Sequence, residues 1–193
     1  QQRRAEWRQH APALAREWGV GVMGLGVIGG AIATRIAALG FPVRGWSRSP
    51  KKLAGIQTFS GEGGLGDFLA GSQVVVNVLP LTPQTEGILN ARTFARMPRG
   101  AFVVNVGRGA HLVEEDLLAA LQSGQLGGAM LDVFRSEPLP AGHPFWSHPK
   151  IVVTPHVAGV TIASEAEAQV IENVRRLERG EPPLGLVDLN RGY

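Results

Sequence analysis

Several side chains that can bind an anion or move a proton stand near the ends of apolar, strand-like runs. Arg108 follows "AFVVNVG", Asp132 ends "GAMLD", His156 follows "IVVTP", and Glu137 lies in "RSEPLP". A histidine can deliver a proton near neutral pH, and a carboxylate beside it favours the protonated ring and fixes its tautomer. An arginine grips a carboxylate bidentately. Together these types suit a site that holds an anionic substrate and delivers a proton to it.

Each of these residues could also have an ordinary structural role. His156 could be a satisfied loop histidine, Asp132 a helix or turn cap, and Glu137 a solvated acid before a proline. The combination is more informative than any member, because their positions after strands would gather them at one edge of a sheet. That expectation depends on the elements that carry them.

Strand-length apolar runs alternate with helical patterns along the chain. The runs are Gly19–Met23, Pro42–Trp46, Val74–Val78, Ala101–Val106, Gly128–Asp132 and Ile151–Val153, with a weaker one at Ile56–Phe59. The helical patterns are Gln1–Trp18, Val27–Leu39, Leu65–Ala70, Gly87–Met97, Glu114–Leu121 and Ala163–Gly180. The runs are continuous, as in strands covered on both faces. The alternation predicts an α/β fold with a doubly wound parallel sheet, which binds ligands at the carboxyl ends of its strands.

The segment "VGVMGLGVIGG" has a glycine spacing suited to a dinucleotide. Gly24-x-Gly26-x-x-Gly29 directly follows a predicted strand and opens a predicted helix. Gly24 makes the turn, Gly26 admits a pyrophosphate, and Gly29 lets helix and strand pack, while the helix N-terminus attracts the anion. The other members of the predicted binding loop are Leu25, Val27 and Ile28. A glycine-rich turn without a ligand is the alternative.

The turn after the second strand favours NADP(H) over NAD(H). An NAD enzyme carries an acid about 20 residues after the glycine loop, on the ribose 2′-hydroxyl. Here the chain reads "GWSRSPKK", with Ser47, Arg48 and Ser49 at that place. Hydroxyl donors and a guanidinium suit a phosphate, which a carboxylate would repel. A solvated basic turn is the alternative, and NAD(H) stays possible.

The order of several motifs resembles a known family. The residues "NVGRG", "LVEEDLLAAL", "GAMLDVF", "EPLP" and "IVVTPHVAG" resemble the D-isomer-specific 2-hydroxyacid dehydrogenases. Within that family, "GWSRSP" and "VDLNRGY" are most similar to the glyoxylate/hydroxypyruvate reductase A branch. The likeness runs over nearly the whole chain. It implies an oxidoreductase that reduces a small 2-keto acid with NAD(P)H.

The resemblance also implies a role for each site residue. Arg108 would hold the substrate carboxylate and polarise its keto oxygen, His156 would be the acid/base, Glu137 its partner, and Asp132 the residue that holds the nicotinamide carboxamide. Gly107 and Gly109 would give the backbone room beside the nicotinamide. Further cofactor contacts are expected from Leu79, Pro80, Thr85, Val106, Gly107, Arg108 and His156.

The chain is divided into three predicted parts. Residues 1–18 form an interdomain linker helix, 19–160 the dinucleotide-binding domain, and 161–193 a C-terminal helix and tail that return to a substrate domain. Family members carry about 100 further residues, an ordinary small-domain size, before the linker. That segment is absent here, so the chain alone is expected to bind cofactor without turnover. The family also implies a homodimer through the cofactor domain.

The composition of the chain limits the classes of ligand and partner that it is expected to bind. The net charge of +3 comes without a basic stripe, so nucleic acid is not expected. No apolar run is long enough to span a membrane, and no signal peptide is visible, so we expect a cytoplasmic protein. The absence of cysteine excludes thiolate metal sites, and we predict no metal. Two alternatives remain: a β-hydroxyacid dehydrogenase-like enzyme, which shares the glycine loop and NADP turn, and a non-catalytic dinucleotide-sensing corepressor module on this fold.

Overall fold

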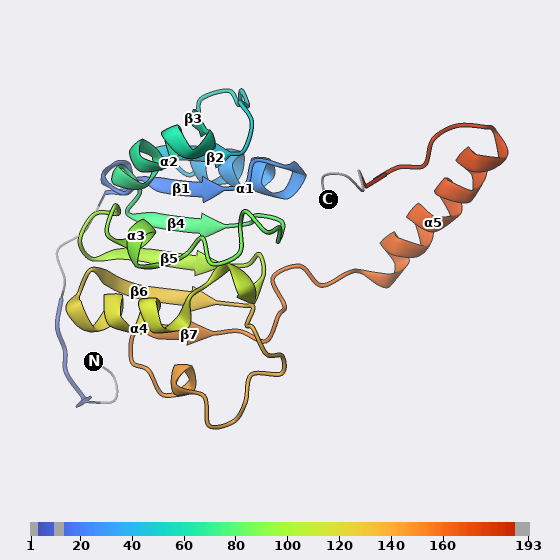
Figure 1. Cartoon of the computed structure of the whole chain (residues 1–193). Coiled ribbons are helices and arrows are strands. Elements are labelled where there is room, and N and C mark those ends of the chain that lie inside the picture. Colours follow the sequence, from blue (N-terminus) through green and yellow to red (C-terminus); the bar gives the residue numbers. More distant parts are fainter. Residues whose placement is uncertain (1–3, 10–13, 188–193) are drawn as a thin grey trace.

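A seven-stranded, wholly parallel sheet forms the centre of the protein (Figure 1). The computed structural model describes residues 4–9 and 14–187. The spatial order is β3-β2-β1-β4-β5-β6-β7, the doubly wound order that places the switch point between β1 and β4. The strands are β1 (Val20–Met23), β2 (Val43–Ser47), β3 (Gln57–Ser60), β4 (Val74–Asn77), β5 (Ala101–Asn105), β6 (Leu126–Leu131) and β7 (Ile151–Val153). The predicted fold class is confirmed.

The helices are α1 (Val27–Ala38), α2 (Gly61–Ala70), α3 (Ala91–Phe94), α4 (Glu114–Ser123) and α5 (Ala163–Glu178), with 3₁₀ turns η2 (Ala15–Glu17), η3 (Gly109–His111) and η4 (Pro144–Trp146).

Successive strand residues point to opposite faces of the sheet, so the hydrophobic core divides into two clusters. On one face Val22 packs with Ala33 of α1. On the other, Met23 belongs to a larger cluster that includes Phe68 of α2, Phe94 of α3 and Leu117 of α4.

The face that carries α1 is less covered at the far end of the sheet. Phe102 of β5 and Val152 of β7 are 38% and 59% exposed, whereas Val103, one residue along β5 and on the opposite face, is fully buried. The ring of Trp18 lies 6.2 Å from that of Phe102 and covers part of this surface.

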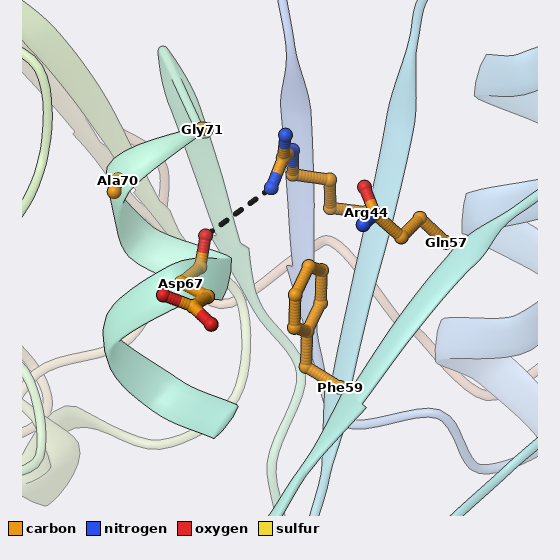
Figure 2. Close-up of a pocket in the computed structure, with 6 residues that line it drawn as sticks. All are labelled: Arg44, Gln57, Phe59, Asp67, Ala70 and Gly71. Carbon is orange, nitrogen blue, oxygen red and sulfur yellow. Dashed lines mark hydrogen bonds between the residues drawn. The ribbon is translucent and has the colours of Figure 1, made fainter. Parts of the chain in front are cut away.

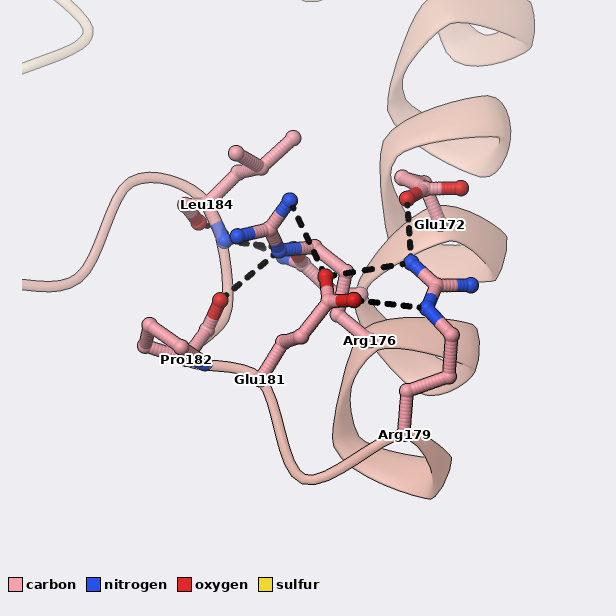
Figure 3. Close-up of polar contacts among 7 residues, drawn as sticks. Glu172, Arg176, Arg179, Glu181, Pro182 and Leu184 are labelled. Atoms are coloured by element: carbon pink, nitrogen blue, oxygen red, sulfur yellow. Dashed lines mark hydrogen bonds and ion pairs between the residues drawn. The ribbon is translucent and has the colours of Figure 1, made fainter.

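Helix α5 stands apart from the sheet (Figure 1). None of its residues is buried, and its apolar side chains Val170, Ile171, Val174 and Leu177 are 51–62% exposed. The following tail folds back on the helix (Figure 3): Arg176 Nε donates to the Pro182 carbonyl, and Arg179 pairs with Glu172 and Glu181. No helix among residues 4–9 and 14–187 has the length and apolarity needed to cross a membrane.

Two helix predictions were wrong. The described parts of 1–18 form turns, extended backbone and η2 instead of a long helix; residues 1–3 and 10–13 lie outside the described residues. Trp7 is fully exposed, so no packing supports a helix there. Within 87–97 only α3 is helical, because the Asn90 side chain caps the Arg92 and Thr93 N–H groups and so begins the helix late.

Candidate functional site

The predicted reactive residues follow β5, β6 and β7 at the carboxyl edge of the sheet. Since the sheet is parallel, the chain leaves every strand at this edge. The structure brings His156 and Glu137 into direct contact, although 19 residues separate them. Arg108 follows β5 at the same edge.

His156 and Glu137 form a hydrogen-bonded pair. The His156 Nδ1 atom lies 2.7 Å from Glu137 Oε2, and the two side chains are 48% and 35% exposed. The second carboxylate oxygen accepts the Phe134 N–H at 2.8 Å. The bond from the His156 ring, helped by that from Phe134, holds the pKa of Glu137 below its ordinary value. An ionised Glu137 accepts a hydrogen bond from the Nδ1–H group, which leaves Nε2 of His156 as the nitrogen available to another molecule.

Asp132 anchors the loop that carries His156. Its side chain is 1% exposed and accepts the Thr154 hydroxyl at 2.6 Å and the Val157 and Ala158 N–H groups at 2.9 Å each. Burial would raise the pKa of Asp132, but these hydrogen bonds outweigh it and hold the pKa below its ordinary value. His156 itself has a φ of 53°, in the left-handed region that non-glycine residues rarely adopt. The Asp132 contacts therefore stabilise an uncommon backbone conformation.

Arg108 projects from a tightly packed loop. Its guanidinium Nη1 donates to the Gly107 carbonyl at 2.7 Å, and the residue is exposed. A Cβ at Gly109 would overlap the backbone of Phe134, and one at Gly107 would lie about 3 Å from Asn77 Nδ2. Protein atoms fill the room that these glycines leave. This packing explains why both positions are glycine, and the expected nearness of the nicotinamide stays a prediction.

The glycine loop has the shape of an anion-binding turn. Gly24 has a φ of 103°, and a Cβ at Gly29 would overlap the Gly24 carbonyl, so both positions require glycine for the fold. Gly26 differs: a Cβ there meets nothing within 4 Å. It is the N-cap of α1, whose first-turn N–H groups have no acceptors within the helix. Space beside these donors fits a phosphate group.

The turn after β2 is built by its serine. Ser47 is 7% exposed, and its hydroxyl donates to the Ser49 carbonyl at 2.8 Å. That bond shapes the turn and leaves Arg48 and Ser49 exposed beyond it. No acid lies among residues 47–52. The turn fits the ribose end of a dinucleotide that carries a 2′-phosphate.

The loop Leu79–Thr85 follows β4 at the same edge. The Thr85 hydroxyl donates to the Pro80 carbonyl at 2.8 Å and accepts the Thr82 N–H at 2.8 Å, which closes the loop on itself. The remaining predicted contact, Val106, is half-buried between β5 and Arg108. The assignment of these residues to the cofactor stays a prediction.

Three buried polar residues at this edge were missed. Asn77 ends β4, Asn105 ends β5, and His111 closes η3; each is 0% exposed. The available signal was an asparagine closing each of the apolar runs "VVVN" and "AFVVN", where a buried amide needs a partner.

A hollow of about 390 Å³ lies elsewhere, beside Arg44, Gln57, Phe59, Asp67, Ala70 and Gly71 (Figure 2). There Arg44 Nη1 donates to the Asp67 carbonyl of α2, and its guanidinium lies 5.5 Å from the centre of the Phe59 ring. These contacts tie α2 to β2 and β3 and involve none of the predicted site residues.

The strand order and glycine turn define a Rossmann-type domain. Residues 1–158 match the family model described as D-isomer specific 2-hydroxyacid dehydrogenase, NAD binding domain. The chain belongs to this family, as its motifs indicated.

Similar proteins and solved structures are named as reductases or dehydrogenases of this family. It is 47% identical over 193 residues to glyoxylate/hydroxypyruvate reductase A of Yersinia enterocolitica, covering all of this chain and 62% of that protein. Similar solved structures include a Xanthobacter autotrophicus D-isomer specific 2-hydroxyacid dehydrogenase in complex with NADPH and MES (50% identity, TM-score 0.96, 100% of this chain and 79% of that one). Another is the NADPH-dependent glyoxylate/hydroxypyruvate reductase of Sinorhizobium meliloti with NADP and sulfate (42%, TM-score 0.96, 100% and 62%). The chain thus spans about three fifths of the curated relative.

Proposed function

We propose that this chain is the cofactor-binding and proton-delivering part of a reductase that converts a small 2-keto acid, of the glyoxylate or hydroxypyruvate kind, into the 2-hydroxy acid with NADPH. The observation that carries the proposal is the 2.7 Å His156–Glu137 pair, at the sheet edge that also carries Arg108 and the glycine loop. The relatives named glyoxylate/hydroxypyruvate reductase A support the substrate class.

The dinucleotide would be held by chain segments that fit it. The open space at Gly26 and the N-terminus of α1 would take the pyrophosphate, and Arg48 with Ser49 would take the 2′-phosphate. The neighbouring structures with NADPH or NADP support this choice over NADH. When bound, the reduced dinucleotide supplies the hydride.

The residues of this chain would do the remaining work. Arg108 would grip the substrate carboxylate and polarise the keto oxygen. His156, protonated on both nitrogens, would give the Nε2 proton to that oxygen as it becomes an alkoxide, while Glu137 accepts the Nδ1–H and stabilises the imidazolium. Asp132 would hold the His156 loop, and its remaining acceptor capacity could serve the nicotinamide carboxamide.

Cofactor binding is tested by a matched pair of glycine variants. Gly26→Ala should leave the free energy of unfolding unchanged, because a Cβ there meets nothing within 4 Å. It should weaken NADPH binding at least about tenfold, because the new methyl would enter the space that we propose for the phosphate. Gly30→Ala is the control, because its Cβ meets only a Leu53 carbon at 4.0 Å. Fluorescence titration measures both. Equal NADPH affinity for Gly26→Ala and wild type would refute the proposed pyrophosphate site at Gly26.

Turnover is tested on two proteins. One is the 193-residue chain; the other joins it to the part of the Yersinia enterocolitica relative that it does not match. NADPH oxidation with glyoxylate is expected from the second and not the first, since a single sheet edge cannot enclose the substrate. No turnover from a folded, NADPH-binding chimaera would refute the proposed activity.

The assembly and location are proposed with the function. We infer a symmetric homodimer through the cofactor domain, supported by the partly exposed sheet face at Phe102 and Val152. We also propose a cytoplasmic location, because a reductase of this kind needs a steady supply of NADPH. Fractionation of cells that express the tagged protein tests it.

A further inference from the structure

A buried cluster of polar side chains lies behind the Arg108 loop. Asn77 and Asn105 occupy paired positions at the ends of β4 and β5, and Asn77 Nδ2 donates to Asn105 Oδ1 at 2.9 Å. The His111 ring joins them from η3, with its Nδ1 atom 2.9 Å from Asn77 Nδ2. All three side chains are fully buried. Burying three polar groups is costly unless their partners are well placed, so the direction of each hydrogen bond matters.

The contacts of His111 define its tautomer. Its Nδ1 atom faces two donors, Asn77 Nδ2 at 2.9 Å and the Arg108 N–H at 3.1 Å, so Nδ1 carries no proton. Its Nε2 atom faces the Pro80 carbonyl at 3.2 Å, so Nε2 carries the proton and donates. Burial lowers the pKa of His111, in agreement with a neutral ring. A protonated ring would place a hydrogen on Nδ1 against both donors.

These bonds hold the backbone of Arg108 from both sides. Its N–H is held by His111 Nδ1, and its carbonyl accepts Asn105 Nδ2 at 3.1 Å and the His111 N–H at 3.2 Å. The Gly107 N–H donates to Asn105 Oδ1 at 3.2 Å. The Pro80 carbonyl, which also accepts the Thr85 hydroxyl, belongs to the loop after β4. His111 therefore joins the arginine loop to the loop Leu79–Thr85.

We propose that His111 is a positioning residue, which with Asn77 and Asn105 fixes the backbone of the Arg108 loop and so aims the guanidinium at the substrate carboxylate. The guanidinium already depends on that backbone, since its Nη1 bonds to the Gly107 carbonyl. The substrate-facing half of this inference rests on the proposed function. The backbone half does not, and it can be measured on the chain itself.

The tautomer is tested by imidazole ¹⁵N NMR on the 193-residue chain. At about pH 8, where a histidine of lowered pKa is neutral, His111 should show an unprotonated, hydrogen-bonded Nδ1 and a slowly exchanging Nε2–H. A proton on Nδ1 of the neutral ring would overturn the proposal. This readout needs no variant, so it holds even if substitutions at His111 prevent folding.

Hydrogen exchange of the Arg108 amide tests whether His111 holds the Arg108 loop. His111→Leu removes the acceptor of that N–H and should speed its exchange about tenfold, the effect of one lost hydrogen bond of about 1.4 kcal/mol. His111→Gln should restore most of the protection, because its amide offers an acceptor and a donor. His143→Leu is the matched control: that histidine bonds to Glu114 and Phe145 and should leave Arg108 exchange unchanged. Unchanged exchange in His111→Leu, or an equal effect of His143→Leu, would overturn the proposal.

The substrate-facing half is tested in the chimaera. His111→Leu should lower kcat/KM for glyoxylate about tenfold, and His111→Gln should recover most of it. Faster exchange without a change in kcat/KM would overturn the aiming role. An inactive wild-type chimaera would instead refute the proposed function, and the exchange result would still decide whether His111 holds the loop.

Discussion

Replacing Asp132 by asparagine should destabilise the protein more than any single hydrogen bond accounts for. The carboxylate accepts three hydrogen bonds, from Thr154, Val157 and Ala158, and is 1% exposed. Asparagine keeps one oxygen and turns the other into an NH₂ group, which faces an N–H donor. At least one charge-assisted bond, worth about 1.5–3 kcal/mol, is lost, and a donor is left unsatisfied in the interior. We expect a loss of about 2–4 kcal/mol in the free energy of unfolding at pH 7.

The loss should depend on pH in a defined direction. The folded pKa of Asp132 lies below its unfolded value, so its stabilisation is complete above the unfolded pKa of about 3.9 and disappears as the pH falls through the folded pKa. The difference between wild type and Asp132→Asn should therefore be constant from about pH 7 to about pH 5 and shrink below about pH 4.

Urea unfolding followed by circular dichroism measures both effects. The control is Asp116→Asn, because Asp116 accepts one N–H, that of Ala91, at 2.8 Å in an exposed place, and asparagine can keep that bond. We expect a change under about 1 kcal/mol there. A loss for Asp132→Asn no larger than that for Asp116→Asn, or one that grows in acid, would refute the reasoning.

Three further changes test the proposed site. Arg48→Ala should weaken the binding of NADPH about tenfold and that of NADH little, because only NADPH has the 2′-phosphate. Equal losses of affinity for the two cofactors in a fluorescence titration would contradict this. In the chimaera, Arg108→Ala should raise KM and lower kcat, whereas His156→Gln should lower mainly kcat, and full activity of His156→Gln would exclude it as the acid. Light scattering of the chain at micromolar concentration should show a dimer, and a mass of 20.5 kDa would count against one.

Residue type and spacing were enough to predict the sheet and the edge at which the candidate site residues lie. Chemistry restricts these positions: a proton donor near neutral pH is a histidine, and glycines at this spacing directly after a strand are typical of a dinucleotide-binding turn. The long helix over 1–18 was wrong for a different reason. Its pattern suited a helix, but a helix in water depends on packing, and Trp7 contacts nothing that would bury it.

The sequence could indicate that Asn77 and Asn105 are buried amides, but it could not give their partners, because these come from distant segments. Asn105 meets Asn77 across 28 positions and His111 meets Asn77 across 34. Asp132 is the instructive case, since the family resemblance assigned it to the cofactor while the structure gives its oxygens to the His156 loop. The histidine and arginine that we predict to act on the substrate are thus held by buried amides and a buried carboxylate, whose loss should be visible in stability and exchange before any substrate is added.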